Sequence, residues 1–157
     1  MKTRLGFVSN SSSTSFIIIG SSASDQLINM IKMTIENNTI VIDNKGELEF
    51  GWDDVKYTTF WDRLNFTMIQ IMYQKQYENS EKYKMLKNVL KAALDVDVIE
   101  NKLSLEYICG KNEFHAYIDH QSSIVEGANI EMFESELELR LFLFSEDSYI
   151  QGGNDND

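Results

Sequence analysis

Apolar residues along the chain cluster in short runs whose spacing predicts a mixture of strands and helices. The first run, Phe-Ile-Ile-Ile within residues 15–19, ends at Gly20. A short run of mostly β-branched residues closed by glycine is typical of a buried strand. We therefore expect a core strand close to the N-terminus.

Three later segments, residues 24–37, 58–78 and 81–95, carry apolar residues at helical spacing. Ser24 and Ser80 stand at the start of the first and third segments, where a hydroxyl can accept an otherwise free backbone N–H. We expect the second and third helices to pack as an antiparallel pair. The apolar positions are Leu27, Ile28, Ile31 and Ile35, then Phe60, Leu64, Met68, Ile71 and Met72, then Tyr83, Leu86, Leu90 and Leu94.

Two β-hairpins are predicted from short apolar runs that flank a turn sequence. Strands at 39–43 and 47–51 enclose Asn-Lys-Gly, and strands at 103–109 and 113–118 enclose Gly-Lys-Asn. Glycine and asparagine tolerate the positive φ angles that tight hairpin turns require. Both hairpins would contribute antiparallel strands.

Residues 134–144 fit two structures. Alternating Glu and Leu favour a strand, whereas a capping box, Ser135 with Glu138, favours a helix. We predict a helix. The fold expected for residues 1–157 is a single α+β domain in which short β-hairpins form a small, mostly antiparallel sheet packed against three to four helices. A Ser-rich arm at 1–13 and a polar acidic tail at 145–157 would frame it.

Composition agrees with one ordinary globular domain, because the chain has 157 residues, of which 43% are hydrophobic. A single cysteine, Cys109, excludes an internal disulfide and fits a reducing compartment. No stretch approaches the roughly 18 apolar residues of a membrane span. We expect a cytoplasmic protein.

The net charge of −11 excludes general nucleic-acid binding, since such binding depends on Lys and Arg at phosphates. An acidic surface that imitates nucleic acid is one alternative, and simple solubility is another. The sequence also lacks a phosphate-binding loop, a dinucleotide fingerprint, zinc-ligand spacing and a nucleophile elbow.

Three polar segments carry the candidate chemistry. Residues 10–15 are Asn-Ser-Ser-Ser-Thr-Ser, and small hydroxyl residues can cradle an anion. Residues 119–123 are Asp-His-Gln-Ser-Ser, in which a carboxylate could orient a proton-transferring histidine. Residues 152–157 are Gly-Gly-Asn-Asp-Asn-Asp, whose oxygens suit a hard cation such as Mg²⁺.

Each polar segment also has a purely structural interpretation. The serines could form a solvated arm, the second segment an ordinary turn, and the third a frayed terminus. The apolar residues on both sides of the serine run favour order there. His115 alternates with apolar residues and is predicted to lie on the face of a strand, and Cys109 to be buried.

Residues 1–16, MKTRLGFVSNSSSTSF, resemble an N-terminal signature, G-F-V-S-N-S-S-S-x-S-F, of uncharacterised small proteins from bacteriophages and bacteria. The stretches Asp-His-Gln-Ser at 119–122 and Gly-Asn-Asp-Asn at 153–156 are similar to pieces that accompany this signature. The resemblance implies a phage-type or bacterial accessory protein, located in the host cytoplasm or the virion if a phage encodes it. It also implies that the three polar segments belong to one site.

Three functions remain open. The first is an enzyme or binder of a phosphate-bearing small molecule or nucleotide, possessing the three-segment site. The second is an acidic protein that binds and modulates a host protein through anchors such as Trp52, Trp61, Tyr73 and Tyr77, which we expect to be exposed. The third is a virion or assembly component. For the first, the catalytic candidates are His120, Asp119 and Ser12, the ligand-binding candidates are Asn10, Ser11, Ser13, Gln121, Ser122 and Asn154, and the metal ligand is Asp155.

Overall fold

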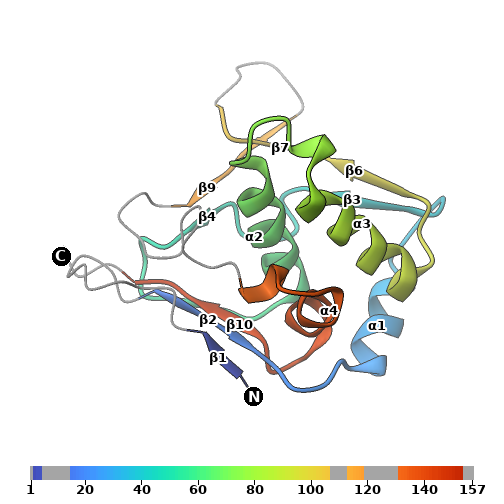
Figure 1. The fold of residues 1–157 in the computed structure, drawn as a ribbon, viewed down its shortest axis with the longest axis horizontal. Coiled ribbons are helices and arrows are strands. Elements are labelled where there is room, and N and C mark those ends of the chain that lie inside the picture. The colour runs from blue at the N-terminus through green and yellow to red at the C-terminus, as the bar shows by residue number, and fades with distance from the viewer. Residues whose placement is uncertain (1, 5–14, 107–112, 119–130, 154–157) are drawn as a thin grey trace.

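The structure is a computed structural model that describes residues 2–4, 15–106, 113–118 and 131–153. Four helices and several small groups of strands make up this part of the chain, which confirms the predicted α+β class (Figure 1). No helix among the described residues is both long enough and apolar enough to cross a bilayer.

The largest sheet has four strands in the order β1-β2-β10-β5, all antiparallel. These strands are β1 (Lys2–Arg4), β2 (Phe16–Ile19), β10 (Tyr149–Gln151) and β5 (Lys56–Tyr57). β2 is the buried strand expected from its apolar run, and it lies inside the sheet between β1 and β10.

The prediction of a polar tail from residue 145 is wrong for residues 145–153. Strand β10 occupies the interior of the sheet, where Ile150 pairs with Ile17 on one side and with Tyr57 on the other. A single fully buried isoleucine is too short an apolar signal to be recognised in a polar sequence. Likewise, the predicted N-terminal arm begins with strand β1, and its remainder lies outside the described residues.

The helices follow the predicted pattern, and each starts after a hydroxyl residue whose side chain accepts a backbone N–H. The ambiguous segment 134–144 is helical, and Ser135 accepts from the Glu138 N–H at 3.1 Å. The helices are α1 (Asp25–Lys32), α2 (Phe60–Met72), α3 (Glu81–Leu94) and α4 (Glu136–Phe144), and two short 3₁₀ helices are η1 (Tyr77–Asn79) and η2 (Glu131–Phe133).

Two helices are shorter than predicted. α1 ends at Lys32 because Thr34 bonds back to the Ile31 carbonyl through both its N–H and its hydroxyl, which closes the last turn. α2 ends at Met72, and Gln76 then adopts a left-handed conformation that redirects the chain into η1. Apolar residues at helical spacing continue beyond both ends, so periodicity alone overestimated the lengths.

Both predicted hairpins are wrong, because the strands involved pair in parallel with distant or offset partners. β3 (Thr39–Ile42) pairs with β6 (Val98–Asn101), and β4 (Glu49–Phe50) pairs with β9 (Tyr117–Ile118). In the second case β7 (Leu103–Ser104) pairs in parallel with β8 (Phe114–His115). The antiparallel pairing therefore lies in the four-stranded sheet.

Gly46 explains why the first turn sequence makes no hairpin. A Cβ at this glycine would lie 2.2 Å from the Trp61 carbonyl oxygen, so the 43–47 loop packs directly on the first turn of α2. The Asp62 carboxylate accepts from the Glu47 N–H at 2.8 Å, and the Asn65 amide donates to the carbonyls of Asp43 and Glu47. The glycine thus permits close backbone approach between distant segments.

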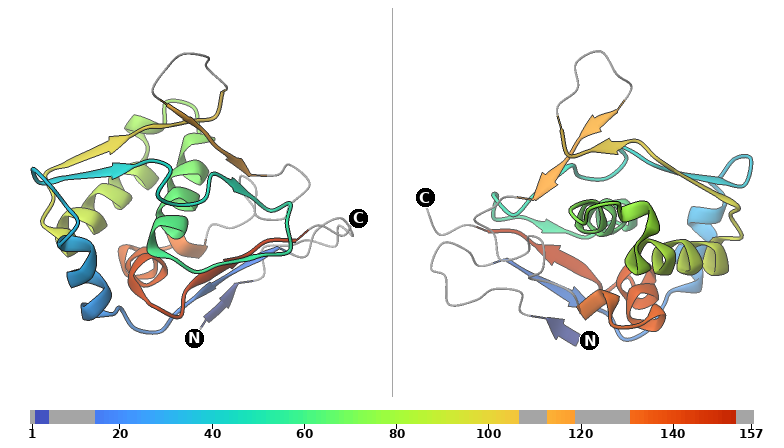
Figure 2. Two further views of the ribbon diagram at one scale, coloured as in Figure 1. Left: turned by 180° about the vertical axis from the view of Figure 1, so that it is seen from behind. Right: turned by 45° about the horizontal axis from the view of Figure 1, so that its top comes forward.

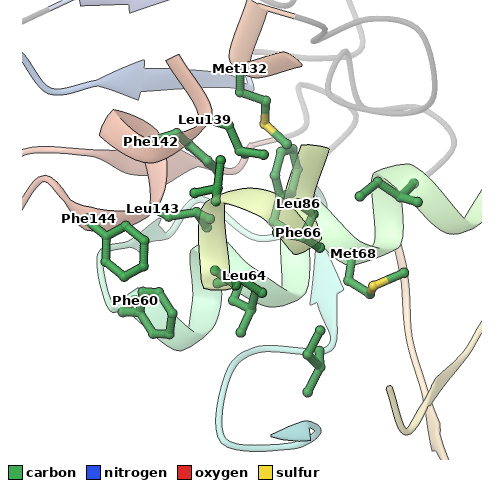
Figure 3. Close-up of a cluster of buried hydrophobic side chains, with 14 of the residues drawn as sticks. Phe60, Leu64, Phe66, Met68, Leu86, Met132, Leu139, Phe142, Leu143 and Phe144 are labelled. Atoms are coloured by element: carbon green, nitrogen blue, oxygen red, sulfur yellow. The ribbon is translucent and has the colours of Figure 1, made fainter. Parts of the chain in front are cut away.

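Helix α2 runs through the centre of the molecule, and every residue from Arg63 to Ile71 is buried. Helix α4 lies between α2 and strand β2, and α3 contacts both helices. The close-up in Figure 3 shows their shared core, in which the rings of Phe60 and Phe144 stack at 5.2 Å between centroids. The labelled core residues are Phe60, Leu64, Phe66, Met68, Leu86, Met132, Leu139, Phe142, Leu143 and Phe144.

Arg63 is a buried cation within this core, with 1% of its surface exposed. Its guanidinium donates to the carbonyls of Leu143 at 2.9 Å and Ser148 at 3.0 Å, and also to Thr58 at 2.5 Å. Burial lowers the pKa of Arg63 to about 10, while Asp62 and Glu146 act in the opposite direction. The side chain is therefore charged at neutral pH and links α2 to the end of α4 and to the turn before β10.

We expect Arg63→Met to lower the free energy of unfolding by about 3 kcal/mol, because two buried carbonyls, those of Leu143 and Ser148, and the partly buried carbonyl of Thr58 lose their donor. Arg63→Lys should recover only part of this loss, since an ammonium lacks the planar fork of the guanidinium. Urea denaturation provides the measurement. Lys84→Met, at an exposed position of α3, is the control and should change stability by no more than about 0.5 kcal/mol. Equal effects at positions 63 and 84 would contradict this role.

Candidate polar site

The candidate site is defined by the described residues that directly flank the three polar segments. The Ser15 hydroxyl donates to the Gly153 carbonyl at 2.9 Å and is buried. Strand pairing gives the same proximity, because Phe16 of β2 lies opposite Gln151 of β10. The described residues that border the serine segment and the C-terminal segment therefore lie side by side.

Gly51 connects the middle segment to these two. The Gly153 N–H donates to the Gly51 carbonyl at 3.2 Å. Gly51 directly follows Phe50 of β4, and Phe50 is the parallel partner of Ile118, the last residue of β9. Figures 1 and 2 show the ends of β4, β9 and β10 and the beginning of β2 on one side of the molecule.

The predicted site residues themselves lie outside the described residues, whereas their flanking residues are described. These predictions stay untested at the level of single side chains. They concern Asn10, Ser11, Ser12, Ser13, Asp119, His120, Gln121, Ser122, Asn154 and Asp155, together with Cys109.

His115 is described and lies where the sequence predicted. It is exposed on strand β8, and its ring stacks with that of Tyr117 at 6.1 Å between centroids. It belongs to the strand pair β7–β8, whereas Ile118, which flanks the site, belongs to the strand pair β4–β9. His115 thus serves as an internal comparison for His120.

The loop of residues 51–55 holds the end of β10 in place. The Gly152 N–H donates to the Val55 carbonyl at 2.8 Å, and the Gln151 amide donates to the Asp54 carboxylate at 3.0 Å. A Cβ on Gly152 would lie 2.6 Å from the Asp53 carbonyl oxygen, so only glycine fits there. This loop fixes the chain just before residue 154.

The apolar and polar pattern of the sequence did not indicate this loop as part of the site. Trp52 is 55% exposed, and Asp53 and Asp54 are exposed beside it, so the loop that binds Gly152 and Gly153 carries an aromatic ring and two carboxylates. The sequence does contain an indication of this loop in Gly-Trp-Asp-Asp, where a glycine precedes three residues that offer stacking and charge. In the structure this glycine, Gly51, has a φ of 100°, which favours glycine. The predicted strand at 47–51 concealed this indication.

The electrostatic environment at this border is acidic. Burial raises the pKa of Tyr57 to about 12, and the carboxylates of Glu47 and Asp53 add to the effect. Lys56 lies beside this tyrosine, and its ammonium is 4.3 Å from the centre of the Tyr149 ring. An anionic ligand here would therefore gain from an accompanying cation.

Two of the predicted anchors are less exposed than expected. Tyr73 is half-buried, and its hydroxyl accepts from the Ile118 N–H at 3.1 Å. Tyr77 is also half-buried and packs edge-on against Tyr83. Tyr73 thus holds β9 close to the end of α2, and Tyr77 packs on α3, which leaves Trp52 and the partly exposed Trp61 as candidate anchors.

Among the described residues, no group of three or more His, Cys, Asp or Glu side chains is arranged to hold a metal ion. Comparison of the chain with protein-family models, with curated proteins and with solved structures gives no match.

We expect Tyr57 to ionise with a midpoint near pH 12 in the folded protein, compared with about 10 for an unperturbed phenol. Because the folded state holds this proton more tightly, Tyr57 contributes stability below pH 10 that is lost as the pH rises towards 12. Phenolate absorbance during a pH titration measures the midpoint. Tyr57→Phe should remove a component centred near 12, and removal of one centred near 10 would contradict the assignment.

Proposed function

We propose that the chain binds a phosphate-bearing small molecule or nucleotide at a polar site formed by residues 10–13, 119–122 and 154–155. One observation carries the proposal: Ser15, Ile118 and Gly153, which flank these segments, are connected through Gly51. Three polar segments attached to one small region of a rigid scaffold have little chain with which to separate, because the nearest residue of each lies one or two positions from its anchor: Ser13 from Ser15, Asp119 from Ile118 and Asn154 from Gly153.

The residue types suit an anionic ligand with a divalent cation. Small serines allow backbone N–H groups and hydroxyls to approach a phosphate. Asp155 supplies oxygen ligands for Mg²⁺, which offsets the acidic border at Asp53 and Asp54. His120 is the proton-transfer group, because an imidazole titrates near neutral pH.

Any chemistry at the site would divide between His120 and a serine. Asp119 orients the imidazole, and Ser12 is the candidate nucleophile.

The resemblance of the N-terminus to phage and bacterial proteins supports the assignment of the chain to phage-type or bacterial accessory proteins. Trp52, exposed at the border, offers a flat surface on which a nucleotide base could stack.

Thermal unfolding with ATP, GTP or inorganic phosphate, each with and without Mg²⁺, tests the binding proposal. A ligand at about 100 times its dissociation constant should stabilise the protein by roughly 2.7 kcal/mol. His120→Ala should abolish or strongly reduce this stabilisation and leave the melting temperature of the free protein nearly unchanged. His115→Ala is the matched control and should retain the full stabilisation.

Two outcomes would contradict the proposal. Absence of stabilisation by every anion with Mg²⁺ would remove the ligand class. A large loss of stability in free His120→Ala would show that this histidine supports the fold.

Convergence of the segments is tested separately by distance measurement. In a Cys109→Ser background, pairs of spin labels at Ser13, Gln121 and Asn154 should give short distances for all three pairs. A label at Lys91, in the C-terminal turns of α3 on the opposite side of the molecule, should give long distances to each (Figure 1). A long distance for any site pair would disprove the three-segment site even if a ligand binds elsewhere.

A further inference from the structure

Two adjoining grooves lie away from the polar site, on either side of Trp61 and Thr34. The first has a volume of about 470 Å³ and the second about 360 Å³. Figure 2 (left) shows the elements that border them: α1, β3 and the first turn of α2. Lining residues include Glu36, Val41, Lys45 and Glu100 in the first groove and Leu27, Met30, Phe60 and Glu146 in the second.

The second groove is bordered by exposed apolar side chains of α1. Met30 lines this groove and is 57% exposed, and Met33, which directly follows the last residue of α1, is 85% exposed. Ile28 and Ile31 bury the other side of α1 in the core, so the methionines are surplus to internal packing. Unbranched methionine side chains adapt to differently shaped partners, and calmodulin uses them in this way.

Trp61 is held rigidly between the grooves. The ring packs edge-on against Phe60 at 5.1 Å between centroids, and the Lys45 ammonium lies 4.9 Å above it. Gly46 fixes the same backbone by its close approach to the Trp61 carbonyl. A pre-ordered aromatic ring loses little entropy when a partner covers it, as is typical of binding anchors.

The charges that line the grooves favour a basic partner. Three carboxylates, those of Glu36, Glu100 and Glu146, lie along them. The two cations are already engaged, Lys45 with the Asp43 carboxylate at 3.2 Å and Arg63 with buried carbonyls. The net charge of −11 adds a long-range attraction for cations and repels nucleic acid and anionic lipid.

We propose that these two grooves form a docking surface for a basic amphipathic segment of another protein. The apolar side of that segment covers Met30, Leu27 and the Trp61 ring. Its lysine or arginine side chains approach Glu36, Glu100 and Glu146. A second copy of this chain is a poor occupant, because two bodies of charge −11 repel each other.

Fluorescence of Trp61 tests the proposal directly. The chain has two tryptophans, so Trp52→Phe leaves Trp61 as the sole reporter. The probe is a synthetic, tryptophan-free peptide with leucines along one helical face and lysines along the other. Its addition should shift the Trp61 emission in a saturable way, with an affinity that falls as salt is added. The same peptide with glutamates replacing the lysines should bind at least about tenfold more weakly.

Two variants locate the binding surface. Met30→Glu, in the groove, should weaken the lysine peptide at least about tenfold, because it places a charge in the apolar contact. Leu137→Glu is the matched control, since Leu137 is similarly exposed at 63% but lies on α4 and does not line either groove. This variant should bind the peptide as the parent does, and both variants should retain the melting temperature of the parent.

Other outcomes would overturn the proposal. These are unchanged Trp61 emission with the lysine peptide, equal binding of both peptides, or equal loss of affinity in the two variants. Light scattering gives one more: a dimer of the parent chain that Met30→Glu dissociates would make a second copy the occupant.

Discussion

The guanidinium of Arg63 holds together three parts of the chain that are distant in sequence. It donates to carbonyls before α2, in the last turn of α4 and in the turn that precedes β10. The last carbonyls of a helix have no partner within it and carry partial negative charge, so a cation there satisfies both needs. No carboxylate is among these contacts. The charge of the guanidinium is stabilised instead by the dipoles of three backbone carbonyls.

The turn that Arg63 fixes determines where β10 enters the sheet. Ser148 contributes from the same corner: its hydroxyl accepts from the Gly20 N–H at 2.8 Å and donates to the Leu141 carbonyl at 2.8 Å. With this corner fixed, β10 is inserted between β2 and β5, which brings Gly153 to Ser15 and Gly51. The position of the residues that flank the polar site therefore depends on a buried cation, Arg63, in the core.

Helix α2 connects the two surfaces to which we assign function. Its first turn positions Trp61 between the grooves and anchors the 43–47 loop through Asp62, while Asn65 secures the same loop from inside. The strand that follows this loop, β4, ends at Phe50, and the next residue, Gly51, accepts the Gly153 N–H at the polar site. A central helix that is buried all round can orient features on opposite sides because its position is fixed by packing from every direction.

The sequence by itself determined the interactions that act between near neighbours. Hydroxyl caps and apolar periodicity located all four described helices, the β-branched run located β2, and the residue types of the three polar segments suggested anion and proton chemistry. Tertiary structure decided the parallel pairing of β3, the insertion of β10 and the proximity of Ser15, Ile118 and Gly153. Such pairings depend on which distant backbone groups and buried surfaces meet. A glycine such as Gly46 permits that approach, but its local sequence resembles that of an ordinary turn.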